Sequence, residues 1–223
     1  MIRLTLLFTL LLPAMALAEP LRVFVSVLPM QTFVEKIGGE HVEVHAMVQQ
    51  GYSPATYDPT PQQIVALAKA KLYIRTGVPF EHAWMQRIRS ASPDMEILDV
   101  RERLALRTLE AHEHEHEHHH ESPGTTALDP HVWTSPVMVK QMAGNIRDAL
   151  SLLDPAHASD FARNHDAFVA ELDSLDRDIH ALLDPLEMRR FMVFHPAWGY
   201  FARAYGLEQL PVEIDECLVL VVG

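Results

Sequence analysis

The sequence predicts an α/β protein of two lobes, in which parallel sheets are flanked by helices and a long helix links the lobes. Short runs rich in β-branched residues alternate with segments of helical periodicity, as in successive βαβ units. Two long helical segments follow this alternation. One further strand, helix and strand come after them, so the second lobe is predicted to be incomplete.

Four strands separated by helices make up the predicted first lobe. Pro29 ends the first strand, Gly38 and Gly39 stop the helix after it, and Pro61 opens the next helix. The predicted strands are 21–28, 42–48, 71–76 and 95–100, and the predicted helices between them are 30–37, 61–70 and 80–92.

Residues 102–128 have no clear periodicity and predict a long surface loop. The segments after it predict helices at 135–153 and 155–183, a strand at 190–194, a helix at 196–205 and a strand at 207–214. The expected organisation is an N-terminal lobe over residues 19–154, a linking helix over 155–184 and a partial C-terminal lobe over 185–223.

The short second lobe has a physical consequence. A single βαβ unit would expose an apolar sheet face and an unpaired strand edge. The apolar run that begins at Cys217 also lacks the polar turn expected after Asp215. We therefore expect a truncated or frame-shifted C-terminus.

The N-terminus has the pattern of a secretory signal peptide over residues 1–18. Arg3 precedes an apolar run, and Ala16-Leu17-Ala18 forms a cleavage site of the A-x-A type. The apolar run is shorter than the roughly 20 residues that span a bilayer, and no lipobox cysteine follows it. A soluble periplasmic protein is expected, and its single cysteine, Cys217, excludes an internal disulfide.

The charge balance limits the class of partner. The chain has 30 acidic and 18 basic residues, a formal net charge of −12, and 48% hydrophobic residues. This composition argues against nucleic acid and anionic lipid as partners and favours cations or basic surfaces. We expect a monomer.

A histidine-rich tract occupies the long loop, within residues 110–122. Its histidines alternate with glutamates, and imidazole nitrogen binds zinc, copper and nickel well. The tract predicts weak capture of several metal ions, although a solvated charge run or a displaced expression tag would have a similar composition. The histidines concerned are His112, His114, His116, His118, His119 and His120.

Two isolated histidines occupy positions typical of ligands. His195 directly follows the predicted strand 190–194, and open α/β sheets build their binding crevices at the carboxyl ends of strands. His131 lies in Asp129-Pro-His-Val-Trp133, where the long loop ends. Taken singly, each histidine also fits a structural role as a hydrogen-bonded polar side chain.

Several short sequence motifs that follow one another in a fixed order make the chain similar to a known family. Over residues 20–215 it resembles the zinc/manganese solute-binding proteins of bacterial ABC transporters, the ZnuA/TroA-like family. The motifs are the strand Val23 to Leu28, Gly51-Tyr-Ser-Pro-Ala-Thr-Tyr-Asp-Pro-Thr-Pro61, Gly77-Val-Pro-Phe-Glu81, the His-rich loop, Asp129-Pro-His-Val-Trp133 and Phe194-His-Pro-Ala-Trp-Gly-Tyr-Phe-Ala-Arg-Ala-Tyr-Gly206.

The resemblance implies one metal ion, Zn²⁺ or alternatively Mn²⁺, bound between two lobes by His131 and His195. It also implies a third histidine where this chain has Ala55, and a late carboxylate that the chain does not reach. Glu81 and His82 are the nearest substitutes, although Glu81 also fits a helix cap. The loop histidines are a further source of ligands, because zinc in a closed site takes about four.

The function that the resemblance implies is metal capture in the periplasm and delivery to an ABC permease in the inner membrane. Binding is expected to weaken as pH falls through the histidine range of about 6.5. A periplasmic zinc buffer and an inactive fragment remain alternatives. A zinc-dependent hydrolase is the competing class. The H-E-x-x-H spacing occurs only within the alternating His/Glu repeat of residues 112–120, and the sequence contains no nucleophile elbow, so no enzymatic activity is expected.

Overall fold

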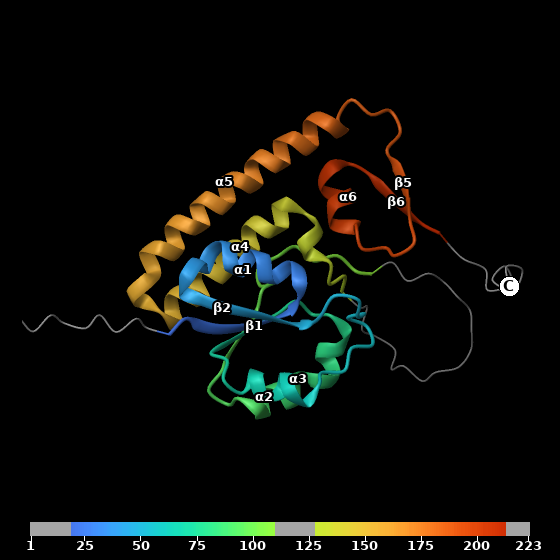
Figure 1. Ribbon diagram of the computed structural model, residues 1–223. Coiled ribbons are helices and arrows are strands. Elements are labelled where there is room, and N and C mark those ends of the chain that lie inside the picture. The colour runs from blue at the N-terminus through green and yellow to red at the C-terminus, as the bar shows by residue number, and fades with distance from the viewer. Residues whose placement is uncertain (1–18, 110–127, 213–223) are drawn as a thin grey trace, which may run out of the picture.

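A computed structural model describes residues 19–109 and 128–212 of the chain. The expected signal peptide, the histidine-rich tract and Cys217 lie outside these described residues. The described part has a larger body built on a four-stranded sheet and a smaller part built on a two-stranded sheet. A long helix joins the two (Figure 1).

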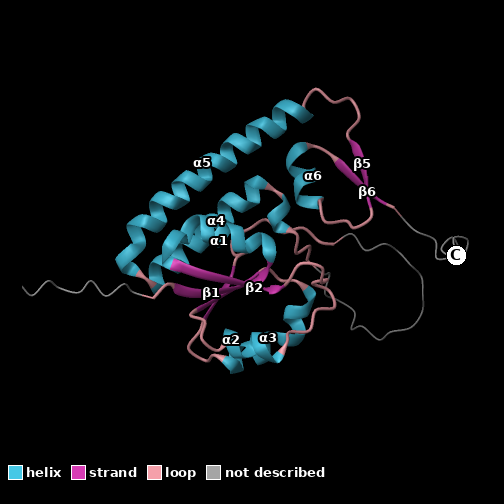
Figure 2. Ribbon diagram, in the orientation of Figure 1, coloured by secondary structure: helices cyan, strands magenta, loops and turns pink. Residues whose placement is uncertain are grey.

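Strands and helices alternate in the predicted order (Figure 2). The larger body contains β1 (Leu21–Val27), α1 (Leu28–Gly38), η1 (Gly39–His41), β2 (Val42–Val48), α2 (Pro61–Leu67), β3 (Leu72–Arg75), α3 (Pro79–Ala91), β4 (Glu96–Asp99), η2 (Val132–Thr134) and α4 (Pro136–Leu153). It is followed by η3 (Pro155–His157), α5 (Ala158–Leu183), β5 (Arg190–Val193), α6 (Gly199–Tyr205) and β6 (Glu208–Pro211).

The larger sheet is parallel throughout, as predicted. Its strand order is β2-β1-β3-β4, and Val23 of β1 lies opposite both Val44 of β2 and Leu72 of β3. Helices α1, α4 and α5 lie on one side of this sheet, and α2 and α3 lie on the other (Figure 1). Both faces are therefore covered, which explains why successive residues are buried in the central strands, at 23–25 of β1 and 72–74 of β3.

Prolines in the first turn begin several of the helices, because proline at this position loses no helical hydrogen bond. Pro29, Pro61, Pro79 and Pro136 occupy the first turns of α1, α2, α3 and α4. Helix α1 starts at Leu28, two residues before the predicted start at Met30. The strand ends at Val27, and Pro29, predicted to end it, lies instead inside the first turn of the helix.

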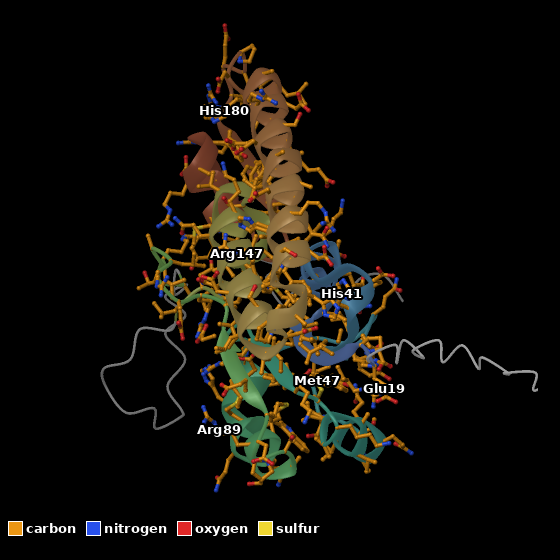
Figure 3. The ribbon with its side chains drawn as sticks, turned by 90° about the vertical axis from the view of Figure 1, so that its left-hand side faces the viewer. Glu19, His41, Met47, Arg89, Arg147 and His180 are labelled. Atoms are coloured by element: carbon orange, nitrogen blue, oxygen red, sulfur yellow. The ribbon has the colours of Figure 1, made fainter. Side chains whose placement is uncertain are left out.

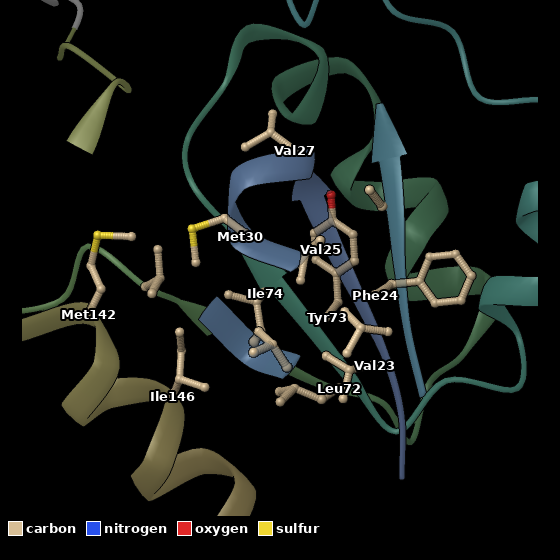
Figure 4. Close-up of a cluster of buried hydrophobic side chains, with 14 of the residues drawn as sticks. Val23, Phe24, Val25, Val27, Met30, Leu72, Tyr73, Ile74, Met142 and Ile146 are labelled. Carbon is tan, nitrogen blue, oxygen red and sulfur yellow. The ribbon is translucent and has the colours of Figure 1, made fainter. Parts of the chain in front are cut away.

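The core lies on both faces of the sheet, between it and the helices that cover each side. Val23 and Val25 of β1 and Ile74 of β3 are fully buried, and Met142 and Ile146 of α4 pack toward them (Figure 4). Burial of apolar surface on this scale supplies the main stabilisation of an α/β body.

Helix α5 connects the two parts. Its 26 residues span about 39 Å at 1.5 Å per residue. Phe161, Phe168 and Leu172 are buried in the core of the larger body, whereas Leu182 in the last turn is exposed. His41 contacts Asp160 in the first turn of α5, and His180 lies in the last turn of α5. Figure 3 shows these two histidines far apart. No helix in the described ranges has both the length and the apolar character needed to cross a membrane.

The smaller sheet exposes apolar side chains, as its single βαβ unit led us to expect. Strands β5 and β6 are parallel, with Met192 opposite Leu210. Met192 and Phe194 are 75% and 80% exposed. One face of this sheet is therefore open to solvent, while α6 packs beside β6.

Two leucines of α4 allow a matched test of core packing. Leu150 is fully buried, whereas Leu152 is 75% exposed. Leu150→Ala is expected to lower the free energy of unfolding by about 2–5 kcal/mol, because it leaves a cavity. Leu152→Ala is expected to change it by less than about 0.5 kcal/mol. Chemical denaturation of both variants measures the difference, and equal effects would contradict the described packing of α4.

Candidate metal centre

Two histidines from different parts of the chain converge at one point. The Nε2 atoms of His131 and His195 lie 3.1 Å apart, although the residues are 64 positions apart in sequence. Their ring centroids are 5.0 Å apart and the ring planes meet at 77°. Zinc–imidazole bonds of 2.0–2.1 Å place two tetrahedral ligand nitrogens roughly 3.4 Å apart. One ion therefore fits between these two nitrogens after a small adjustment.

His195 is positioned by the end of strand β5. The strand ends at Val193, so His195 lies at the carboxyl edge of the smaller sheet. The backbone N–H of Ala197 donates to the His195 carbonyl at 2.8 Å, which closes a tight turn. The N–H of Trp198 donates to Gln209 Oε1 at 3.1 Å and ties this turn to β6.

His131 is positioned by its neighbour Asp129. The Asp129 carboxylate is 1% exposed, and its Oδ1 atom accepts from the His131 backbone N–H at 3.0 Å. The same oxygen lies 2.7 Å from His131 Nδ1. Because a carboxylate only accepts, Nδ1 carries the hydrogen and the Nε2 lone pair points toward His195. This is the carboxylate–histidine arrangement that orients imidazole ligands in metal sites.

The surroundings of His195 favour its neutral, ligating form. Partial burial lowers the pKa of the His195 imidazole below its usual value, and the nearby His131 lowers it further. Asp129 acts in the opposite direction and raises this pKa, but its effect is smaller. Since only neutral imidazole binds a metal ion, His195 can bind with little competition from protons near neutral pH.

The structure does not bring Glu81 and His82 to this pair. The Glu81 side chain is fully buried, and its oxygens accept from the backbone N–H groups of Thr76 at 3.0 Å and Gly77 at 2.8 Å. The Ser26 hydroxyl and the Arg75 guanidinium also donate to it. His82, the next residue on α3, is exposed. Glu81 therefore fastens the turn between β3 and α3. It does not cap α3 as the alternative interpretation had expected, because its oxygens bind N–H groups that precede the helix and the N-cap Val78 has no side-chain hydrogen bond.

No third ligand completes the site within the described ranges. Ala55, where the resemblance implies a histidine, lies exposed in a turn, and its methyl group cannot bind a metal. Across residues 19–109 and 128–212, no group of three histidine, cysteine or acidic side chains is arranged to hold an ion. The six histidines of the tract lie outside the described residues, so their part in the site stays a prediction.

The described ends of the long loop nevertheless meet beside the pair. Thr108 and Leu128 form an antiparallel bridge, and the Asp129 N–H donates to the Arg107 carbonyl at 2.9 Å. We call residues 107–108 and 128–129 the stem of the loop. The stem therefore ends only two residues before His131.

The sequence did not predict the roles of two residues of the site, Asp129 and Tyr200. Asp129 was noted only as part of the segment around His131, although a carboxylate two residues before a candidate ligand is a usable signal of an orienting partner. Tyr200 was not singled out, yet its hydroxyl donates to the Asp129 carbonyl at 2.8 Å. Because Tyr200 lies 71 positions from Asp129, no local pattern could predict that contact.

The fold and the site together define a class of protein. A parallel α/β body, a long connecting helix and a second α/β part that meets the first at a pair of histidines form the architecture of a two-lobed solute-binding protein. Two solved structures agree with this class. A crystal structure of ZnuA has 37% sequence identity and a TM-score of 0.77, and the match covers 88% of this chain and 72% of that chain. A zinc-bound ZnuA with residues 138–173 deleted, in that protein's own numbering, has 38% identity and a TM-score of 0.76, with 88% and 71% covered.

The chain belongs to the family described as zinc-uptake complex component A, periplasmic (ZnuA), whose profile matches residues 23–216. This confirms the resemblance stated from the sequence. The high-affinity zinc uptake system protein ZnuA of Bacillus subtilis is 28% identical over 196 residues, and the manganese-binding lipoprotein MntA of Halalkalibacterium halodurans is 29% identical over 196 residues. Each match covers 87% of this chain and 61% of the relative, so the chain spans about three fifths of their length.

The orienting role of Asp129 leads to a testable expectation. Asp129→Asn keeps the size of the side chain but weakens its hold on His131 Nδ1 and allows the wrong tautomer. Zinc affinity is expected to fall by about 10–100-fold, as is typical when such an outer partner is lost. Competition with a chelating dye measures the dissociation constant. An unchanged constant would show that His131 needs no orienting carboxylate.

Proposed function

We propose that this chain is the metal-capturing component of an ABC importer, which binds Zn²⁺ in the periplasm and delivers it to a permease in the inner membrane. Zn²⁺ is the cargo of the protein, with Mn²⁺ as the alternative. The observation that carries the proposal is the 3.1 Å approach of the His131 and His195 Nε2 atoms. Membership of the ZnuA family and the names of the relatives, which refer to zinc uptake and manganese binding, support it.

Capture follows from the placement of the two ligands. His131 belongs to the larger body and His195 to the smaller part, so a shared ion adds a bond between them. The choice of zinc rests on ligand chemistry, because imidazole nitrogen suits zinc, whereas manganese favours carboxylate and other oxygen ligands. Two imidazoles leave about two positions of a tetrahedral ion for water or for additional side chains. Those open positions let the ion leave again, as delivery to a permease requires.

A periplasmic zinc buffer is the second candidate, and Ala55 favours it. With alanine in the turn where the resemblance implies a ligand, the site holds its ion less firmly than a complete set would. The two functions differ in transfer. An importer component restores zinc-limited growth only together with its permease, whereas a buffer alters free zinc without one.

A ligand substitution tests the proposed site directly. His131→Ala is expected to weaken zinc binding by more than about 100-fold, because a directly bound ligand contributes more than an outer partner whose loss typically costs 10–100-fold. His82→Ala, which removes an exposed histidine on α3, serves as the matched control and is expected to leave the affinity unchanged. Isothermal titration of the chelator-treated protein measures both. Equal affinity in His131→Ala and the unmodified chain would contradict the proposal.

The role of the histidine-rich tract is tested by deleting residues 112–120. The deletion is expected to lower the number of weakly bound zinc ions, because it removes six imidazoles, and to leave the tightest site in place. Equilibrium dialysis followed by elemental analysis counts the ions bound at each zinc concentration. Loss of the tightest site on deletion would instead show that the tract supplies essential ligands to His131 and His195.

A further inference from the structure

Helix α6 carries a buried tyrosine that contacts the stem of the long loop. Tyr200 is 1% exposed, and its hydroxyl donates to the Asp129 carbonyl at 2.8 Å. The same hydroxyl accepts from the Arg107 backbone N–H at 3.2 Å. The hydroxyl thus bonds to both strands of the stem, which are themselves paired through the Asp129 N–H and the Arg107 carbonyl.

A second contact between α6 and the stem involves the Arg107 side chain. Its Nη1 atom lies 3.4 Å from Asp129 Oδ2. The same guanidinium lies directly over Gly199, the first residue of α6, where an added Cβ would stand 1.1 Å from Nη1. Only glycine at this position allows the guanidinium to reach Asp129 along its present path.

Arg203, one turn further along α6, ties the helix to the same region. Its Nη2 atom donates to the Ala105 carbonyl at 2.7 Å. Its guanidinium also lies 5.3 Å from the centre of the Tyr200 ring, within cation–π range. Three side chains therefore join the start of α6 to residues 105–107 and 129.

These contacts connect the same two segments that the histidine pair connects. His195 lies five residues before Tyr200, in the turn between β5 and α6, and His131 lies two residues after Asp129. The hydroxyl of Tyr200 thus holds the backbone of Asp129, whose carboxylate orients His131. A connection beside the ligand pair keeps the two imidazoles at bonding distance before an ion arrives, which reduces the ordering that binding would otherwise require.

We propose that Tyr200 is a positioning residue for the metal pair. Its hydroxyl bonds to Asp129 and Arg107 of the stem. These bonds join the segment that carries His195 to the segment that carries His131, two residues after Asp129. We call these two hydrogen bonds the latch. The inference rests on the proposed function and deepens it. It adds a residue that touches no metal but sets the distance between the two ligands. Loss of the hydroxyl should weaken zinc binding while the fold persists, because the ring and its apolar contacts remain.

Two tyrosines on α6 provide the experiment with its control. Tyr200→Phe removes the hydroxyl that bonds to the stem. Tyr205→Phe removes an equivalent hydroxyl on the same helix, one that donates to Asp176 Oδ1 on α5 at 2.7 Å. Both side chains are buried. The comparison therefore separates loss of the latch from loss of any buried tyrosine hydrogen bond on α6.

Each full-length variant is measured for zinc affinity, for the melting temperature of the metal-free form and for the visible absorption spectrum of bound Co²⁺. Tyr200→Phe is expected to weaken zinc binding about tenfold, the lower end of the range for lost outer partners, and to alter the Co²⁺ spectrum. Tyr205→Phe is expected to keep the affinity and spectrum of the unmodified chain. Arg203→Gln, which removes an exposed tether, is expected to give a smaller loss in the same direction and replaces Tyr200→Phe if that variant does not fold.

The outcomes distinguish the latch from the proposed function. If the unmodified chain and Tyr200→Phe bind zinc equally well, the positioning role of Tyr200 is wrong, and the proposed function is unaffected. If both phenylalanine variants lose affinity in step with their melting temperatures, Tyr200 has only a structural role. An unmodified chain that binds no zinc would overturn the proposed function, and the latch with it.

Discussion

The imidazole of His131 lies between the buried Asp129 carboxylate and the imidazole of His195, and the candidate site depends on this arrangement. The carboxylate accepts from Nδ1 at 2.7 Å, which leaves Nε2 free of hydrogen and directed at the partner ring 3.1 Å away. Without that orientation, the two histidines would lie close together but the Nε2 atom of His131 would not be directed at His195. With it, the Nε2 lone pair of His131 points at Nε2 of His195.

The larger body provides the rigid part of this geometry. The segment Asp129–His131 directly precedes η2, which packs against α4, and α5 carries the chain on to the smaller sheet. Because the first turns of α5 are anchored through Phe161 and Phe168, the smaller part is held at the end of a stiff helix. The contacts of α6 with the loop stem then decide how closely His195 approaches His131.

Glu81 shows why a residue type in a plausible place is weak support for a ligand. The residue lies just beyond β3, near the carboxyl edge where α/β proteins bind their ligands. Its side chain instead satisfies two backbone N–H groups and two side-chain donors inside the fold. A carboxylate fully engaged in this way would lose those bonds on turning to a metal ion, at a high energetic cost. The surrounding donors, and not the position along the strand, determine what Glu81 does.

The sequence by itself determined the order of strands and helices, the parallel sheet and the two candidate histidines. These features follow from local periodicity, from prolines that begin helices and from short motifs such as Asp129-Pro-His-Val-Trp133. The family resemblance implied that the two imidazoles meet, but the tertiary structure alone decided how they are oriented, that Glu81 is occupied elsewhere, and that Tyr200 bonds to Asp129. The physical reason is that each of these outcomes depends on donors and acceptors brought together by packing between distant segments, which periodicity along a single segment does not encode.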